Sequence, residues 1–283
     1  PPGPARPRVP ATPQASGDPV SGRRCRAYTD LARSHHQSRP TYELISSCRG
    51  VTKTFGGLRA LRGVDLDLHE GETHGVVGPN GSGKSTLINV LSGYLPLDSG
   101  RITLAGRSIE HLEAHRVAEL GLARTYQIPR PFATLDVLRN VQAACYFGNA
   151  TGRPRNTLAE ARRWVEFVGL ASVAEQDVGS LTLHQRKLLE LARALACRPY
   201  VVFLDEVLTG LNPRELVDGI ELVRRVRELG ISIVVVEHIM RVILDLCDHL
   251  TVLNFGEVIA RGLPRDCLED EQVVGAYLGH GHA

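Results

Sequence analysis

The stretch VVGPNGSGKST, residues 76–86, fits the spacing G-x-x-x-x-G-K-[ST], and the fold can be inferred outward from it. Two apolar residues lead into it as a short strand and a helical pattern follows it, so backbone N–H groups and the positive helix end should converge on one point. Glycines let the backbone wrap closely around phosphate oxygens, because they have no Cβ. The predicted members of this phosphate-binding loop are Gly78, Pro79, Asn80, Gly81, Ser82, Gly83, Lys84, Ser85 and Thr86.

Two side chains at the end of this loop have specific chemistry. The Lys84 ammonium should reach the β- and γ-phosphates of a nucleotide, and the Ser85 hydroxyl should ligate Mg²⁺. A glycine turn without a ligand is the structural alternative. The strand before the loop and the helix after it favour the phosphate-binding interpretation.

An acidic pair follows a second apolar run, VVFL at 201–204. In a parallel sheet, strand ends of this kind line the ligand crevice. Asp205 would then hold the Mg²⁺ shell, and Glu206 would orient and polarise the attacking water. An acidic pair after a strand is on its own more often a helix N-cap. In a chain that also has the loop at 78–86, we favour the catalytic interpretation.

Strands alternate with helices along most of the chain. The patterns predict a helix from Lys84 to about Leu91 and a mostly helical stretch at 133–196, with breaks at 148–156 and 178–182. Short apolar or alternating runs predict strands at 64–68, 74–78, 101–106, 200–206, 232–238 and 250–256. This alternation predicts an α/β layer with a mainly parallel sheet, into which the helical block at 127–183 is inserted.

The composition is that of an ordinary globular protein. The chain has 283 residues, of which 43% are hydrophobic, but its longest apolar runs are far shorter than the roughly 18 residues that cross a bilayer. Its six cysteines form no C-x-x-C pair, which argues against a zinc site or a disulfide framework and suits a reducing compartment. Because no apolar run is long enough to cross a bilayer, any membrane contact should come through a partner.

The first 43 residues differ from the rest of the chain. Eight of the sixteen prolines fall within the first forty residues, beside seven arginines and two aspartates. Such a segment lacks the apolar surface to offset the entropy of ordering, so we predict a disordered tail or linker at 1–43. A basic arm that touches anionic lipid is the alternative. Because acidic residues outnumber basic ones in the remainder, we expect no nucleic-acid partner.

The motifs together resemble the ATP-binding subunits of ABC transporters. The resemblance rests on an ordered series of segments: GPNGSGKST, ARTYQ, SLTLHQRKLLELARAL, VVFLDE and VVVEH. Within that family the sequence is most similar to the branched-chain amino acid importer ATPases, on the segments FGGLRALRGVDLDL, LINVLSGYLPLDSG, GLARTYQIPRPF, TGLNP, VEHIM and GAYLG. The likeness covers roughly residues 44–279.

The resemblance implies a fold, an activity and partners. The fold is the ABC ATPase fold, a RecA-like P-loop NTPase core with a mainly parallel sheet, an antiparallel β part and an inserted helical subdomain within residues 44–283. The activity is hydrolysis of ATP with Mg²⁺ to power import of branched-chain amino acids or a related small solute. The partners are a second ATPase subunit, identical or not, transmembrane permease subunits and, indirectly, a solute-binding protein. The chain would sit on the cytoplasmic face of the cell membrane through the permease.

Three further site residues are implied by the resemblance. Phe55 occupies the place of the aromatic residue that stacks on adenine, which is usually tyrosine. Gln127, after ARTY, matches the glutamine that touches Mg²⁺ and the attacking water at the hinge toward the permease. His238, after the strand at 232–236, matches the histidine that contacts the γ-phosphate. The structural alternatives are a core phenylalanine, a surface glutamine and a satisfied structural histidine.

The family signature, usually L-S-x-G-Q, departs from the pattern here. It reads Leu181, Thr182, Leu183, His184, Gln185, and the resemblance implies that Thr182, His184 and Gln185 face the nucleotide of the partner subunit. The Thr182 hydroxyl can cap the helix that follows. His184 replaces glycine, and its ring either blocks close backbone approach to phosphate or adds an N–H donor. The site expected to hydrolyse ATP is therefore the one that combines this chain's phosphate loop with the partner's signature.

Two other departures are smaller. Val207 stands where the family often has proline, and Asn212 stands where many members have aspartate.

The functions left open are a soluble ABC ATPase that acts on ribosomes or DNA and a regulatory ATP-binding half with little turnover. A P-loop kinase would need neither the signature helix nor the histidine at position 238. Soluble ABC ATPases that act on ribosomes or DNA usually have two ATPase units in one chain or a long coiled-coil insertion, and neither pattern occurs in this sequence.

Overall fold

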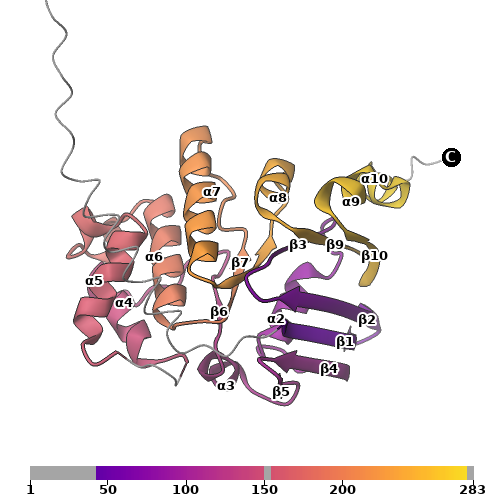
Figure 1. The fold of residues 1–283 in the computed structure, drawn as a ribbon, viewed down its shortest axis with the longest axis horizontal. Coiled ribbons are helices and arrows are strands. Elements are labelled where there is room, and N and C mark those ends of the chain that lie inside the picture. Colours follow the sequence, from indigo (N-terminus) through magenta and orange to yellow (C-terminus); the bar gives the residue numbers. More distant parts are fainter. Residues whose placement is uncertain (1–42, 150–153, 279–283) are drawn as a thin grey trace, which may run out of the picture.

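The computed structural model describes residues 43–149 and 154–278. The described residues form an α/β fold in which two β-sheets meet along strands β2 and β10 and helices cover them (Figure 1). The predicted tail at 1–43 lies outside the described residues except for Glu43. Among the described residues, no helix has the length and apolar character needed to cross a bilayer.

The larger sheet has six strands in the order β10-β9-β3-β8-β7-β6. Its strands are β3 (Thr73–Val77), β6 (Leu122–Arg124), β7 (Val201–Asp205), β8 (Ser232–Val236), β9 (His249–Asn254) and β10 (Glu257–Gly262). Neighbours pair in parallel, except that β10 runs antiparallel to β9. The predicted mainly parallel sheet is confirmed.

The central strands are buried on both faces, as their continuous apolar runs predict. In β7, Val201 and Phe203 join one hydrophobic core, whereas Val202 and Leu204 join the other. Because successive side chains of a strand point to opposite faces, the sheet separates the two cores. The strand ends on one edge are thereby held rigidly by packing on both sides.

The smaller sheet is antiparallel and has the order β2-β1-β4-β5. Its strands are β1 (Leu44–Phe55), β2 (Leu58–His69), β4 (Ser99–Leu104) and β5 (Arg107–Ser108). The sequence predicted strands only at 64–68 and 101–106 of this sheet. The long hairpin of β1 and β2 was missed, because residues 44–63 mix apolar and polar positions irregularly around several register shifts.

Nine α-helices lie in the described residues. They are α2 (Lys84–Leu91), α3 (Ala114–Glu119), α4 (Val137–Tyr146), α5 (Thr157–Phe167), α6 (Leu183–Ala196), α7 (Pro213–Glu228), α8 (Met240–Leu246), α9 (Pro264–Glu269) and α10 (Glu271–Leu278). The prediction for α2 is confirmed at both ends. Figure 1 shows α4, α5 and α6 grouped at the side of the molecule away from the antiparallel sheet.

The predicted helical block at 133–196 contains three of these helices, but it starts later than expected. The Asp136 side chain accepts a hydrogen bond from the N–H of Arg139, so it caps α4 and the helix begins at Val137. The predicted break at 178–182 contains one 3-10 turn, and the break at 148–156 lies partly outside the described residues. The inserted subdomain at 127–183 stays a prediction, and α6, which starts at its limit, packs against α4 and α5.

Candidate active site

The phosphate loop connects β3 to α2, as the sequence predicts. Gly78 has φ 150°, and a Cβ there would lie 2.1 Å from the carbonyl oxygen of Leu253, so only glycine fits. The Ser82 carbonyl accepts a hydrogen bond from the N–H of Gly256 over 2.9 Å. The turn between β9 and β10 therefore supports the loop from behind and fixes its shape.

Lys84 lies folded back onto this loop. Its ammonium donates hydrogen bonds to the carbonyl oxygens of Gly78 at 2.8 Å and Pro79 at 2.9 Å. Burial lowers the pKa of the Lys84 ammonium, while the negative charges of Glu206 and Asp205 act in the opposite direction. The two predicted carboxylates therefore lie within electrostatic reach of the loop cation, although they are some 120 positions away in the sequence.

A cavity of about 290 Å³ opens beside the loop. Phe55 lies on its wall with 45% of its surface exposed, and the Lys53 ammonium lies 5.6 Å from the centre of its ring. The residues that line this cavity are Phe55, Leu58, Arg59, Ala60, Arg62, Gly81, Ser82, Gly83, Lys84, Ser85, Thr86 and Phe255. The structure thus places Phe55 and six predicted loop residues around one space. Arg59, Arg62 and Phe255 are additions that no motif indicated.

Three neighbouring strands of the large sheet bring the other predicted residues to one edge. β3 ends at the phosphate loop, β7 ends at Asp205, and β8 ends shortly before His238. Because β3, β8 and β7 are adjacent and parallel, their carboxyl ends share an edge. His238 is exposed there.

Asp205 is buried and held from two sides. Its backbone N–H donates to the hydroxyl of Thr125 over 3.2 Å. Its carboxylate oxygen Oδ2 accepts a hydrogen bond from the guanidinium of Arg124 over 2.8 Å. The sequence predicted Asp205 but not Arg124. The segment ARTYQ contains this arginine, yet its spacing does not indicate which carboxylate the arginine meets.

Glu206 occupies a strained backbone position next to Asp205. Its φ is 51°, a conformation that costs a residue with a side chain about 1–3 kcal/mol and is concentrated at functional sites. Its side-chain oxygen Oε2 accepts a hydrogen bond from Nε2 of Gln127 over 2.6 Å. The structure therefore brings together the predicted water-polarising carboxylate and the predicted hinge glutamine.

The loop after Glu206 is fixed by two buried charged residues that the sequence did not single out. The Lys187 ammonium donates a hydrogen bond to the carbonyl of Glu206 over 3.1 Å, and burial lowers the pKa of this ammonium. The Glu237 carboxylate accepts hydrogen bonds from the N–H of Leu208 at 2.8 Å and the hydroxyl of Thr209 at 3.0 Å. Burial raises the pKa of Glu237. In the sequence, Lys187 and Glu237 could have been noticed only as charged residues within otherwise apolar patterns.

The signature segment lies at the start of α6 and lines no part of the cavity beside the phosphate loop. Thr182 caps the helix, as predicted: its hydroxyl accepts from the N–H of Gln185 at 3.2 Å, and the Gln185 side chain accepts from the N–H of Thr182 at 2.9 Å. His184 follows with its Nδ1 buried and without a hydrogen-bond partner among the described residues. Asn212 makes the same kind of capping box at α7, which explains how asparagine serves at that position.

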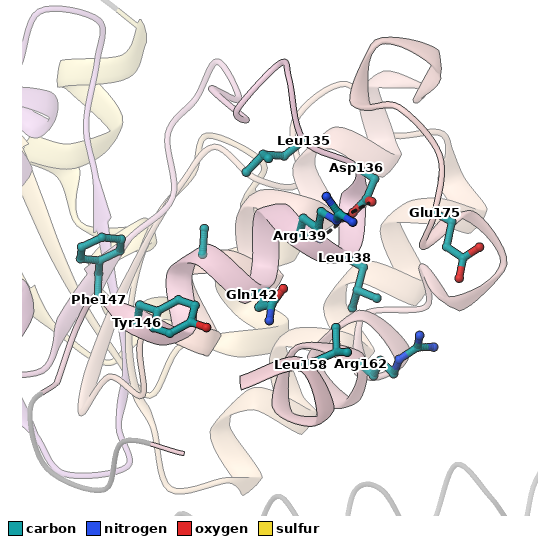
Figure 2. Close-up of a pocket in the computed structure, with 11 residues that line it drawn as sticks. Leu135, Asp136, Leu138, Arg139, Gln142, Tyr146, Phe147, Leu158, Arg162 and Glu175 are labelled. Carbon is teal, nitrogen blue, oxygen red and sulfur yellow. Dashed lines mark hydrogen bonds and ion pairs between the residues drawn. The ribbon is translucent and has the colours of Figure 1, made fainter. Parts of the chain in front are cut away.

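A larger hollow lies elsewhere, on the helices. It measures about 760 Å³ and is bordered by α4 and α5, with Arg139, Tyr146 and Arg162 around it (Figure 2). None of the predicted site residues lines it. The smaller cavity at the phosphate loop is the candidate active site, because six loop residues including Lys84 line it, and the Asp205 and Glu206 carboxylates lie within electrostatic reach of the Lys84 ammonium.

Mg²⁺ fits the donor chemistry of this edge. Ser85, Asp205 and Gln127 offer a hydroxyl, a carboxylate and an amide oxygen, and Mg²⁺ prefers hard oxygen ligands of this kind. Arg124 engages Oδ2 of Asp205, and no hydrogen bond within the described part of the chain engages Oδ1. An acidic oxygen is therefore available at the edge to which the phosphate loop belongs.

Comparisons with known proteins identify one family and one fold. The family model for "ABC transporter" matches residues 61–209. The chain is 34% identical over 256 residues to the high-affinity branched-chain amino acid transport ATP-binding protein BraF of Pseudomonas aeruginosa, across 86% of this chain and 99% of that protein. It is also 34% identical over 245 residues to the probable branched-chain amino acid transport ATP-binding protein LivG of Archaeoglobus fulgidus, across 83% and 95%. A solved ATP-binding cassette of an ABC transporter in its ADP conformation has a TM-score of 0.76 and 31% identity, across 84% of this chain and 100% of that one.

Proposed function

Because the chain belongs to the ABC transporter family and is an ATPase of that family, we propose that it powers an importer of branched-chain amino acids or a related small solute. The observation that carries this proposal is the placement of the Lys84 loop, Asp205 and Glu206 at the shared carboxyl edge of the adjacent parallel strands β3, β8 and β7. The solute rests on the names of the relatives BraF and LivG, which are transport ATP-binding proteins.

Phosphate binding is the task of the loop in this proposal. Backbone N–H groups of residues 78–86 and the Lys84 ammonium surround the β- and γ-phosphates, and Phe55 stacks on adenine. Lys84 exchanges its hydrogen bonds to Gly78 and Pro79 for phosphate oxygens when ATP arrives. Mg²⁺, held by Ser85, Asp205 and Gln127, would neutralise charge that develops on the phosphates.

Hydrolysis is the task of the residues at the ends of β7 and β8. The Glu206 carboxylate orients and polarises the attacking water, and Gln127 holds that carboxylate through the 2.6 Å hydrogen bond. His238 contacts the γ-phosphate. These groups come from three separate segments, so small movements of the Gln127 segment change the alignment of Glu206.

A second ATPase subunit completes the site. Thr182, His184 and Gln185 lie at the N-terminus of a fourteen-residue helix, where N–H groups and the helix dipole favour an anion. They face the γ-phosphate of the ATP that is bound by the partner subunit. The His184 ring stands in place of glycine there, so the productive site combines this chain's phosphate loop with the partner's signature.

A permease is the other proposed partner. A cavity of about 260 Å³ lies between the core and α4, and four exposed aromatic rings line it, those of Tyr94, Tyr126, Phe132 and Phe147. Tyr126 directly precedes Gln127, so a permease segment seated in this cavity would act on the hinge. A membrane position on the cytoplasmic face and an indirect link to a solute-binding protein follow from this contact.

The proposal is tested by measuring ATP hydrolysis of the purified chain and of its Glu206→Gln variant, each with and without reconstituted permease subunits. We expect permease to stimulate the wild type and the substitution to lower the rate by about 100-fold or more. A chain that hydrolyses ATP but ignores every permease partner would instead support the soluble ABC ATPase. A chain that binds ATP without turnover would support the regulatory half.

A further inference from the structure

Arg124 bridges two elements that carry the predicted Mg²⁺ ligands. It is the last residue of β6, and its two terminal nitrogens divide between different acceptors. One nitrogen donates to Oδ2 of Asp205, at the end of β7, over 2.8 Å. The other donates to Oδ1 of Asn89 on α2.

Asn89, the second acceptor of Arg124, lies on the same helix as Ser85. Asn89 follows Ser85 by four residues on the same helix, so the two side chains share one face of α2. Arg124 therefore ties the helix face that presents the Ser85 hydroxyl to the carboxylate of Asp205.

The bridge is buried and rigid. Only 11% of the Arg124 side chain and 9% of the Asp205 side chain are exposed. One further contact restricts the guanidinium, which lies 5.2 Å from the ring centre of Tyr126. Its Nε is buried without a hydrogen-bond partner among the described residues. A buried ion pair of this kind contributes little net stability compared with apolar packing, so its geometry needs another explanation.

We propose that Arg124 is a positioning residue for Mg²⁺, which holds Oδ2 of Asp205 so that Oδ1 faces the Ser85 hydroxyl across the phosphate loop. This inference rests on the proposed function, because it assumes that Asp205 and Ser85 share the metal. Residues that orient metal ligands from behind commonly affect metal affinity by 10- to 100-fold. Without Arg124, the Asp205 carboxylate would turn toward the Lys84 ammonium and withdraw both groups from the nucleotide.

The test compares binding of the non-hydrolysable analogue AMP-PNP in Mg²⁺ and in EDTA, by calorimetry. For wild type we expect Mg²⁺ to strengthen binding. In Arg124→Gln we expect this Mg²⁺-dependent gain to shrink by about tenfold, with the EDTA affinity changed much less. Arg124→Lys should recover part of the gain, because one ammonium can reach only one of the two acceptors.

Asn89→Ala separates positioning from charge. It keeps the Arg124–Asp205 ion pair and removes only the second acceptor, so we expect a smaller loss in the same direction. It also carries the test if Arg124→Gln does not fold. Arg116→Gln is the matched control, since this exposed arginine pairs with Glu119 on α3 and lines no part of the cavity at the phosphate loop, and its Mg²⁺-dependent gain should equal that of wild type.

The outcomes separate the inference from the function beneath it. If Mg²⁺ does not strengthen the binding of AMP-PNP to wild type, the proposed metal site itself is wrong. If wild type gains and both Arg124→Gln and Asn89→Ala keep that gain, Arg124 has only a structural role and the inference is overturned. A larger gain in Arg124→Gln would also overturn it, because Arg124 would then be a competitor of the metal.

Discussion

Gln127 and Glu206 lie 79 positions apart in the sequence, yet Nε2 of Gln127 donates a hydrogen bond to Oε2 of Glu206 over 2.6 Å. The contact connects the segment next to the proposed permease cavity with the carboxylate proposed to polarise water. A displacement of that segment would therefore reach the catalytic carboxylate directly.

Gln127→Leu tests this contact. A hydrogen bond to a charged group contributes about 1.5–3 kcal/mol, so we expect the ATPase rate to fall roughly ten- to a hundredfold. AMP-PNP affinity in EDTA should change little, because the phosphate loop is intact. Gln142→Leu on α4 is the control, since the Gln142 side chain donates a hydrogen bond to Thr157 on α5 and to none of the predicted site residues that the structure describes. An unchanged rate in Gln127→Leu would contradict the role given to this contact.

His184→Gly tests the effect of the signature departure. A ring beside phosphate keeps backbone N–H groups at a distance, and glycine removes that obstacle. We expect ATP hydrolysis by the assembled transporter to rise when this substitution is made. A rate that stays the same or falls would mean that the ring does not hinder the site.

Phe55→Leu tests adenine stacking at the cavity wall. An aromatic contact contributes about 0.5–1.5 kcal/mol beyond buried area, so AMP-PNP should bind roughly three- to tenfold more weakly. Phe55→Tyr should bind as wild type does. Phe147→Leu, which alters an exposed ring outside this cavity, serves as the control. Equal affinity in Phe55→Leu and wild type would remove Phe55 from the nucleotide site.

Glu72 predicts how stability responds to acid. Burial raises the pKa of this carboxyl, but hydrogen bonds from His74 and from the N–H of His69 outweigh burial and lower the pKa from its ordinary value of 4.5 to about 2. A carboxyl with a lowered folded-state pKa stabilises the fold above its unfolded pKa, and this contribution is lost as the pH falls through the folded one. Its contribution at neutral pH is on the order of 2–3 kcal/mol.

The measurement is urea unfolding between pH 7 and pH 2 for wild type and Glu72→Gln. We expect the variant to be less stable at pH 7, with the difference in unfolding free energy shrinking as the pH falls from about 4.5 toward about 2. Glu119→Gln on α3, which removes a partly exposed carboxylate paired with Arg116, is the control. A difference that stays constant over that range would contradict the lowered pKa.

Much of the fold could be predicted because local patterns and packing agree. The strands β3, β7 and β8 are continuous apolar runs buried on both faces, and α2 starts where the loop motif places it. The hairpin of β1 and β2 was not predictable in the same way, since its register shifts interrupt the alternation. Its strands are set by pairing with each other and with β4.

The candidate site shows the same limit. Motifs identified the loop, Asp205 and Glu206, because each is a residue type with required chemistry beside a predicted strand, whereas Gln127 was indicated only by the family resemblance. Sequence reasoning missed Arg124, Lys187 and Glu237, because their roles depend on the particular atoms to which they form hydrogen bonds in the folded chain. Those contacts join residues 19 to 81 positions apart, and only the packed fold defines them.

The central claim is that the Lys84 loop holds a nucleotide, and AMP-PNP binding to the purified chain in magnesium buffer tests it most directly. The account predicts saturable binding by wild type and a loss of at least tenfold in affinity in Lys84→Ala, where phosphate loses its charge-assisted hydrogen bonds. No binding by folded wild type, or equal binding by Lys84→Ala, would contradict it.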